Sequence, residues 1–288
     1  MPETLGGGVD ARDAPDVIDA PDAKGTEMPR FAANLTMLFT DRPFLERFDA
    51  AARNGFRAVE YMFPYQEDTD GIARALDRLK LDQVLFNLPA GDWAAGDRGV
   101  AVHPGRREEF RRGVGQAVEL ARRYRCPRVN CLVGKRDERL AYEEQWRCLV
   151  DNLRYAAGQL VSQGITLLVE PINTYDIAGF FLSTSAQAVR LLDDVGAPNA
   201  RIQYDIYHMQ RMEGNLVHTM ARLRERLGHV QVADSPDRHE PGTGEINFPY
   251  VLKQLDATGY EGYVGLEYKP SGPTDASFGW IEMMGFRR

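Results

Sequence analysis

Residues 165–170 read Ile165-Thr166-Leu167-Leu168-Val169-Glu170, a short apolar run that ends in a carboxylate. Runs of this length and composition are typical of strands that are buried on both faces of a parallel sheet. An amphipathic stretch, 143–162, precedes the run, and a second one, 184–195, follows it after a Ser-Thr-Ser cluster that can cap a helix. The segment therefore predicts a helix–strand–helix unit of an α/β fold.

The same alternation continues along the rest of the chain. The short apolar runs are 31–38, 58–62, 83–88, 128–133, 165–170, 201–205, 229–233 and 263–267. The helical patterns are 44–54, 108–124, 143–162, 184–195, 215–227, 247–258 and 274–283. Strict alternation predicts a parallel sheet covered by helices. Eight such units favour closure into a single (β/α)8 TIM barrel over an open doubly wound sheet.

The first 29 residues have a different composition from the rest of the chain. They contain a Gly-Gly-Gly run and frequent Asp and Pro, which cannot bury enough apolar surface to fold. We therefore expect a disordered extension, 1–29, before the barrel domain, 30–288. Met28 stands directly before the first apolar run, so a translation start there is compatible with the sequence.

Composition excludes several classes of protein. The net charge of −7 disfavours a nucleic-acid partner, because tracking a phosphate backbone needs clustered Lys and Arg. No stretch approaches the ~18 apolar residues of a membrane span, and a signal-peptide pattern is absent, so we expect a cytoplasmic protein without a membrane partner. The odd set Cys126, Cys131 and Cys148 predicts reduced, buried thiols. No Walker loop or dinucleotide fingerprint occurs, so no nucleotide cofactor is expected.

Oxygen-bearing side chains recur at the ends of the last four runs. Glu170, Asp205 and Glu267 end the fifth, sixth and eighth runs, and Gln231 lies inside the seventh. The steps between these four residues are 35, 26 and 36, each about one strand–helix unit, so they are expected at the rim where such barrels hold their active sites. A ring of oxygen ligands suits a hard divalent cation, Mg2+ or Mn2+. The competing interpretation is that each acid caps a helix or pairs with an arginine.

Carboxylates at one rim also suggest a reaction. Two of them on opposite sides of a small hydroxy-carbonyl compound can move a proton between adjacent carbons through an enediolate. Burial beside another acid raises the pKa of a glutamate toward neutral pH, and a metal would stabilise the enediolate charge. This chemistry is aldose–ketose isomerisation.

Six stretches carry a resemblance to the hydroxypyruvate isomerase family, within the larger xylose-isomerase-like barrel group. They are NLPAGDWAAGDR (87–98), NCLVGK (130–135), EPIN (170–173), QYDIYHMQRMEG (203–214), EPGTGEIN (240–247) and GLEYKP (265–270). The resemblance covers the chain from about residue 31 to residue 288, and it implies interconversion of hydroxypyruvate and tartronate semialdehyde (2-hydroxy-3-oxopropanoate). It also implies that Glu170 and Glu267 are the proton donor and acceptor. A four-carbon 2-oxo-tetronate substrate would fit the same motifs.

The chain departs from related sugar epimerases at one position. Their metal ligands are Glu, Asp, His and Glu, and here the third position holds Gln231. A neutral amide oxygen is a weaker ligand for Mn2+ than imidazole, so the sequence leaves metal dependence open.

Four further residues are candidates for substrate binding. His208 follows Asp205 at i+3 in what we interpret as the loop after the sixth strand. A 2-oxo or hydroxy acid substrate carries a carboxylate and needs a cation, for which Lys135 and Arg238 are the best placed and Lys269 is a third option. Structural hydrogen bonding or a solvated surface position is the alternative for each.

Two other classes of function compete with the isomerase. A metal-dependent phosphodiesterase acting on abasic DNA, like the AP endonucleases, shares the barrel architecture, but it would need more histidine ligands and a basic groove. A non-catalytic sugar-acid binding protein would not need two facing acids. The sequence leaves oligomeric state open, and a homo-oligomer is compatible with it.

Overall fold

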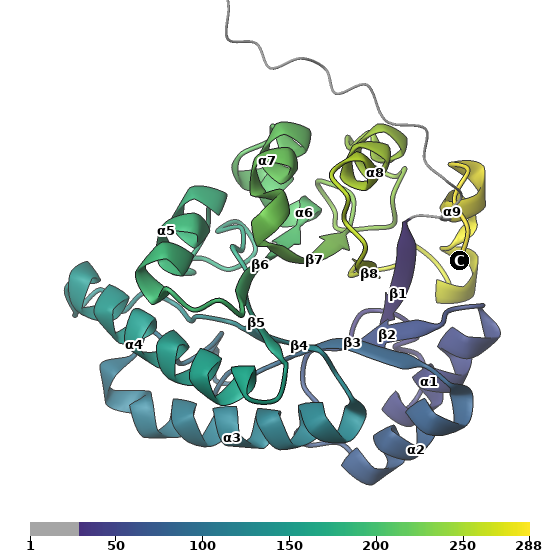
Figure 1. The fold of residues 1–288 in the computed structure, drawn as a ribbon. Helices are drawn as coiled ribbons and strands as arrows, with labels where there is room; N and C mark the ends of the chain where they lie inside the picture. Colours follow the sequence, from purple (N-terminus) through teal and green to yellow (C-terminus); the bar gives the residue numbers. More distant parts are fainter. Residues whose placement is uncertain (1–28) are drawn as a thin grey trace, which may run out of the picture.

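The structure is a computed structural model that describes residues 29–288. Within this range eight parallel strands close into a barrel in chain order, with the helices outside it (Figure 1). The strands are β1 (Arg30–Asn34), β2 (Ala58–Glu60), β3 (Asp82–Asn87), β4 (Arg128–Cys131), β5 (Thr166–Val169), β6 (Ala200–Asp205), β7 (Leu227–Val232) and β8 (Tyr263–Leu266). The expected TIM barrel is confirmed. The expected disordered extension lies outside the described residues, except for Pro29.

Helices follow the strands around the outside of the barrel. They are α1 (Phe44–Arg53), α2 (Thr69–Leu79), α3 (Arg107–Tyr124), α4 (Tyr142–Val161), α5 (Ser185–Val195), α6 (Ile206–Met212), α7 (Leu216–Leu223), α8 (Phe248–Ala257) and α9 (Gly279–Met283). The helix α5 illustrates why these segments are helical. Thr184 and Gln187 form a reciprocal capping box at its start, and Gly196 ends it with a φ of 66°.

Two helices were missing from the sequence prediction and one was too long. The helix α2 begins after Asp68, whose side chain accepts from the backbone N–H of Gly71. The helix α6 begins directly after Asp205, so the segment that we had interpreted as a loop is helical. The stretch 274–283 is not one helix, because a 3-10 turn (Thr274–Ala276) stops at Ser277, whose hydroxyl donates to the carbonyl of Thr274.

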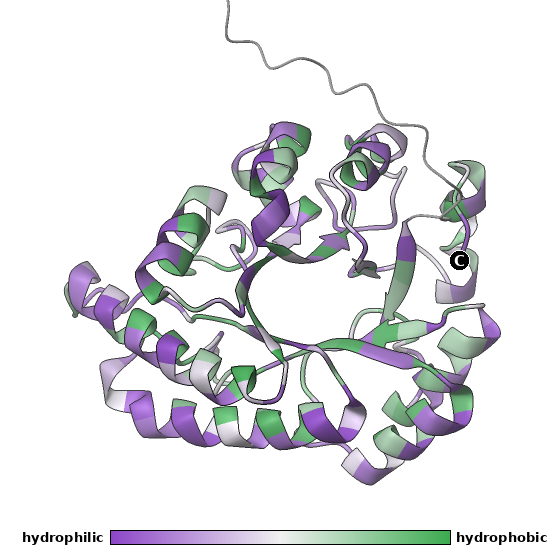
Figure 2. Cartoon of the chain, viewed as in Figure 1, coloured by the Kyte–Doolittle hydropathy of each residue, from purple (hydrophilic) through white to green (hydrophobic). Residues whose placement is uncertain are grey.

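Apolar side chains fill two separate regions. The larger core is made of buried apolar residues from the strands and the surrounding helices, and Figure 2 shows how apolar and polar residues are distributed along both. A small second cluster, Ala32, Ala58, Val84, Leu85 and Leu168, is separate from it. Because side chains alternate along a strand, Ala32 shares the inner face of β1 with Asn34, which places this cluster inside the barrel. This cluster fills one end of the barrel interior with apolar side chains. The inner-facing residue that follows it on β1, Asn34, is polar.

Two expectations about the chain as a whole can be compared with the structure. Cys126, Cys131 and Cys148 are free and buried, and burial raises the pKa of the Cys126 and Cys131 thiols to about 12. The predicted buried thiols are therefore confirmed. Between residues 29 and 288 every helix is too short or too polar to cross a membrane.

Candidate active site

A cluster of buried polar side chains occupies the carboxyl end of the barrel. Glu170 follows β5, Asp205 ends β6, Glu267 follows β8, and His208 lies on the first turn of α6. All four are buried, and one ligand atom from each lies within 4.8 Å of the others. The barrel thus brings together three of the acids that the sequence predicted at its rim.

The two carboxylate oxygens of Asp205 have different roles. Its Oδ1 accepts from the backbone N–H of Tyr207 at 2.8 Å and of His208 at 3.3 Å, which caps α6. Its Oδ2 is buried in the cluster without a hydrogen-bond partner, 3.6 Å from Nε2 of His208. The cap explains why His208 lies on a helix rather than in a loop, and why its ring faces the acids.

Glu170 is held at one oxygen and free at the other. The amide of Asn130, on β4, donates to Oε2 at 3.0 Å, while Oε1 lies 3.7 Å from Nε2 of His208. Burial holds the pKa of Glu170 well above its usual value, and the charges of Glu267 and Asp205 raise it further.

Glu267 joins the cluster from the end of β8. The guanidinium of Arg238 donates to its Oε2 at 2.8 Å, and the amide of Asn34 lies 3.4 Å from its Oε1. Burial raises the pKa of Glu267 to about 8, an effect that Arg238 opposes and the charge of Asp205 supports. Both glutamates therefore hold a proton more readily than an exposed glutamate does.

The charges of the cluster do not cancel. Its three carboxylates face one guanidinium, that of Arg238, which also lies 3.7 Å from Oδ2 of Asp205. His208 adds no positive charge near neutral pH, because burial lowers its pKa well below the usual value and the charge of Arg238 lowers it further. The site must therefore take up a proton or a second cation to approach neutrality.

The remaining predicted residues lie outside this cluster. Lys135 and Lys269 are exposed, and Lys135 pairs through its backbone with Phe180. Gln231 is buried on β7, where its oxygen accepts from the amide of Gln203 at 2.5 Å and its nitrogen donates to Oε1 of Glu60 at 2.8 Å. The structure thus brings His208 and Arg238 to the acids, but neither lysine, and it occupies the Gln231 oxygen with another amide.

Several functional-site residues were not identified from the sequence. They are Asn34, Glu60, Asn130, Asn173 and His229, and all are buried. A signal existed for some of them, because Glu60 and Asn130 are polar residues inside otherwise apolar runs and such residues need partners when buried. The hydrogen bonds of Asn130 to Glu170 and of Asn34 to Glu267 join neighbouring strands at the same rim, and the apolar pattern does not show which polar side chains point to that rim.

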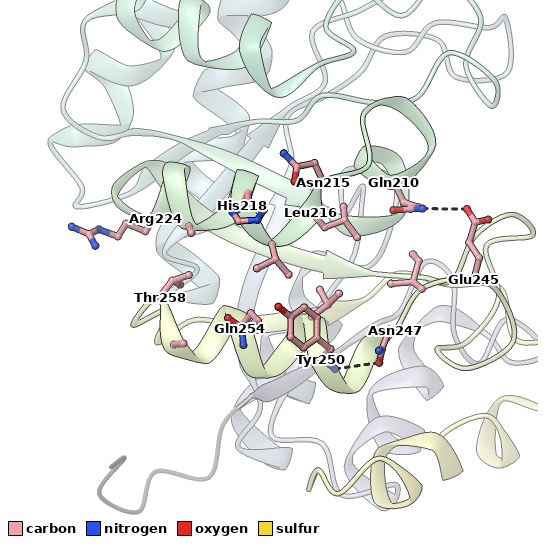
Figure 3. A pocket seen from close by; sticks show the side chains of 15 residues that line it. Gln210, Asn215, Leu216, His218, Arg224, Glu245, Asn247, Tyr250, Gln254 and Thr258 are labelled. Carbon is pink, nitrogen blue, oxygen red and sulfur yellow. Dashed lines mark hydrogen bonds between the residues drawn. The ribbon is translucent and has the colours of Figure 1, made fainter. Parts of the chain in front are cut away.

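A groove of about 540 Å³ lies on the outside of the barrel between α7 and α8 (Figure 3). His218 of α7 and Tyr250 of α8 are among its lining residues, and none of the clustered acids is. Glu245, at one end, accepts from the amide of Gln210. The groove has no pair of facing acids, so the chemistry belongs to the cluster in the barrel mouth.

The cluster also fits a divalent cation. Carboxylate oxygens are the ligands that Mg2+ and Mn2+ prefer, and three come from separate elements to one place. The buried, unpartnered Oδ2 of Asp205 is the kind of atom that a cation would satisfy. Glu170, Asp205 and Glu267 could therefore hold a metal.

Comparisons with known proteins agree with this architecture. Residues 48–284 match the family model described as a xylose isomerase-like TIM barrel. The chain is 52% identical over 255 residues to the hydroxypyruvate isomerase of Escherichia coli, covering 88% of this chain and 99% of that protein. It is 43% identical over 258 residues to the 2-oxo-tetronate isomerase of Cupriavidus necator, with 88% and 98% covered. A crystal structure described as AP endonuclease, family 2, from Brucella melitensis superposes with a TM-score of 0.87 at 45% identity, covering 89% of this chain and 99% of that one.

Proposed function

The chain belongs to the xylose isomerase-like TIM barrel family, and from this premise we propose that it is an isomerase interconverting hydroxypyruvate and tartronate semialdehyde. One observation carries the proposal. Glu170 and Glu267 each place a carboxylate oxygen within 4.8 Å of the other in a buried cluster, with raised pKa values that suit proton transfer. The 52% identity to the Escherichia coli enzyme supports the substrate.

The proposed reaction moves protons without a net change in composition. One glutamate, as a carboxylate, removes a proton from the hydroxymethyl carbon next to the ketone, and the electron pair forms an enediolate. The other glutamate, in its protonated form, gives a proton to the former carbonyl carbon. The hydroxyl proton moves from the first oxygen to the second, which leaves an aldehyde and a secondary alcohol.

Neighbouring side chains support these steps. Asn130 orients Glu170 through one oxygen and leaves its Oε1 available, whereas Arg238 and Asn34 orient Glu267 through both of its oxygens. Arg238 is also the cation in the cluster that the substrate carboxylate would meet. Burial excludes water, which strengthens these interactions and protects the enediolate.

We further propose a divalent metal, Mg2+ or Mn2+, held by Glu170, Asp205 and Glu267. When bound, it would supply positive charge for the oxygens of the substrate. Gln231 becomes a fourth ligand only if its oxygen exchanges the amide of Gln203 for the metal. The proposal is limited to small-molecule substrates in the cytoplasm, which the acidic charge and the reduced cysteines support.

Two alternatives have specific support. The 43% identity to a 2-oxo-tetronate isomerase favours a substrate one carbon longer, handled by the same two glutamates. The description of the Brucella melitensis structure favours phosphodiester cleavage at abasic DNA. The net charge of −7 weighs against a nucleic-acid substrate, because DNA binding needs a basic surface.

A single set of incubations tests these assignments. The protein is mixed with hydroxypyruvate in D2O, with and without Mg2+ or Mn2+, and the substrate and product carbons are followed by NMR. We expect deuterium at the hydroxymethyl carbon and the appearance of tartronate semialdehyde. Parallel incubations with 2-oxo-tetronates and with an abasic DNA duplex rank the alternatives. Absence of both exchange and product under all metal conditions would remove the isomerase proposal.

A further inference from the structure

We propose that Asn173 fixes His208 as an Nε2–H hydrogen-bond donor to substrate oxygen, and that His208 is therefore not a ligand of any metal in the cluster. This inference deepens the proposed function and rests on it for the identity of the acceptor. It assigns Asn173 as a positioning residue.

The orientation of the Asn173 amide is fixed by its own loop. The backbone N–H of Asp176 donates to Oδ1 of Asn173 at 2.8 Å, so this oxygen is identified by a donor that can only donate. The amide nitrogen then points to Oδ2 of Asp176 at 3.1 Å and to Nδ1 of His208 at 2.7 Å. A flipped amide would place its nitrogen against the Asp176 N–H, so the observed orientation is the favourable one.

The histidine tautomer follows from this orientation. Since the Asn173 nitrogen donates, Nδ1 of His208 must be the acceptor and carries no proton. A neutral imidazole has one proton, which must then be on Nε2. Asn173 is fully buried and His208 is nearly so, so water does not compete for the contact between them.

The protonated nitrogen faces the acids across a gap. Its distances to Oε1 of Glu170 and Oδ2 of Asp205 are 3.7 and 3.6 Å, longer than a direct hydrogen bond. A substrate oxygen bound beside these atoms, rather than between them, would accept the N–H, and this hydrogen bond would stabilise the negative charge that develops in an enediolate. A protonated ring nitrogen has no lone pair for a metal, so the ligands from this cluster are carboxylate oxygens, a set that suits Mg2+ or Mn2+.

Asp176, which accepts a hydrogen bond from Asn173, is itself held by a second hydrogen bond. The Oδ2 of Asp176 also accepts from the hydroxyl of Tyr207 at 2.9 Å, and Tyr207 is buried on the same helix as His208. Asp176, Asn173 and His208 thus form one chain of hydrogen bonds between the loop after β5 and α6. Loss of the middle member would leave the ring without its directing donor.

Nitrogen NMR of the full-length protein tests the tautomer without any variant. In 15N-histidine-labelled protein near neutral pH, we expect the signals of His208 to show a protonated Nε2 and an unprotonated Nδ1, with or without added Mg2+. A His208→Gln variant assigns these signals by their loss. The opposite tautomer, or a doubly protonated ring, would overturn the proposal. This outcome is separate from the proposed function, because the tautomer is measured without substrate.

Variants test the positioning role. We expect Asn173→Ala to lower kcat about 100-fold while KM changes less than about threefold, because the donor matters most where charge develops. His208→Gln, which keeps an N–H donor, should retain more activity than His208→Leu. Tyr175→Phe, at an exposed site in the same loop, serves as the matched control. Equal kcat values for His208→Gln and His208→Leu, or an unchanged kcat for Asn173→Ala, would contradict the role.

Bound Mn2+ gives a readout that does not depend on turnover. Pulsed EPR of the Mn2+-loaded protein should show no directly coordinated histidine nitrogen, and His208→Gln should change Mn2+ affinity by less than about twofold. A directly coordinated nitrogen that disappears in His208→Gln would make His208 a ligand and overturn the proposal. If Mn2+ does not bind, the nitrogen NMR spectrum alone decides the tautomer.

Discussion

Oε2 of Glu60 lies 2.6 Å from Nε2 of His229, and both side chains are fully buried inside the barrel. The other oxygen of Glu60 accepts from the amides of Asn34 and Gln231. Gly265 of β8 leaves the space for this carboxylate, since a Cβ at that position would overlap it. The pair therefore anchors a polar layer directly beneath Glu267, to which Asn34 also reaches.

The first prediction concerns this buried pair. Glu60→Gln removes the carboxylate oxygen that contacts Nε2 of His229 in a buried hydrogen-bond network and should lower the free energy of unfolding by about 2 kcal/mol, as measured by urea denaturation. The control, Glu225→Gln, changes an exposed acid and should stay within about 0.5 kcal/mol of the wild type. Equal stabilities of the two variants would show that the pair contributes nothing.

The second prediction separates the roles of the two glutamates. Glu170→Gln and Glu267→Gln should each lower kcat by about 10²–10⁴-fold, because each removes a group that transfers a proton. In D2O, the variant that lacks the base at the hydroxymethyl carbon should lose exchange there. The other variant should keep exchange while losing product formation. Loss of activity in only one variant would argue against a two-glutamate shuttle.

The third prediction is a pH dependence of stability. The pKa of Glu267 is about 8 in the folded protein, mainly through burial, against a usual value of 4.5. Between these values the folded state holds a proton that the unfolded state has lost, so stability is full below pH 4.5 and falls as the pH rises toward 8. The loss should be on the order of 5 kcal/mol. Urea unfolding at a series of pH values measures it, and Glu267→Gln, which stays neutral, should flatten the curve.

Much of the fold was predictable because apolar content alone marks the buried strands. Each of the eight runs overlaps one of the eight strands, and the acids at the ends of β5, β6 and β8 follow from where those runs end. Side-chain direction was less accessible. Lys135 directly follows a strand region but is exposed, because the chain turns at Gly134 with a φ of 114° and leaves the barrel mouth.

The polar layer inside the barrel was the least predictable part. Asn34 pairs in register with Glu60 on the next strand, but the contact between Gln231 and Glu60 arises only when the first and last strands meet. Residues 60 and 229 are far apart in the sequence, and no local pattern indicates that they meet when the barrel closes. The helix α6 was missed because Asp205 was assigned only to the functional site. One oxygen of Asp205, Oδ1, also caps this helix.

The fourth prediction concerns metal binding. If Glu170, Asp205 and Glu267 hold Mg2+ or Mn2+, a concentration 100 times Kd should stabilise the folded protein by about 2.7 kcal/mol and raise Tm by about 5 °C. Asp205→Asn removes a charged ligand and should abolish most of this rise. Asp41→Asn, at an exposed acid, should leave it intact. A Tm that ignores both cations in the wild type, while EDTA also has no effect, would remove the metal from the proposal.

The fifth prediction asks which cation receives the substrate carboxylate. Arg238 contacts Glu267 and Asp205, whereas Lys135 is exposed and absent from the cluster. Arg238→Lys should therefore raise KM for hydroxypyruvate about 10–100-fold, the cost of a lost charge-assisted hydrogen bond, and Lys135→Met should change it less than about twofold.

Dihydroxyacetone separates carboxylate binding from the effect of Arg238 on Glu267. This ketone keeps the hydroxy-carbonyl group but lacks the carboxylate, so it reports only on proton transfer. If Arg238 binds the carboxylate, Arg238→Lys should slow hydroxypyruvate much more than it slows dihydroxyacetone. Equal slowing of both compounds would mean that Arg238 acts through the glutamate. If only Lys135→Met changes KM, the substrate carboxylate binds near Lys135 and not at Arg238. The substrate would then extend beyond the cluster to reach that ammonium group.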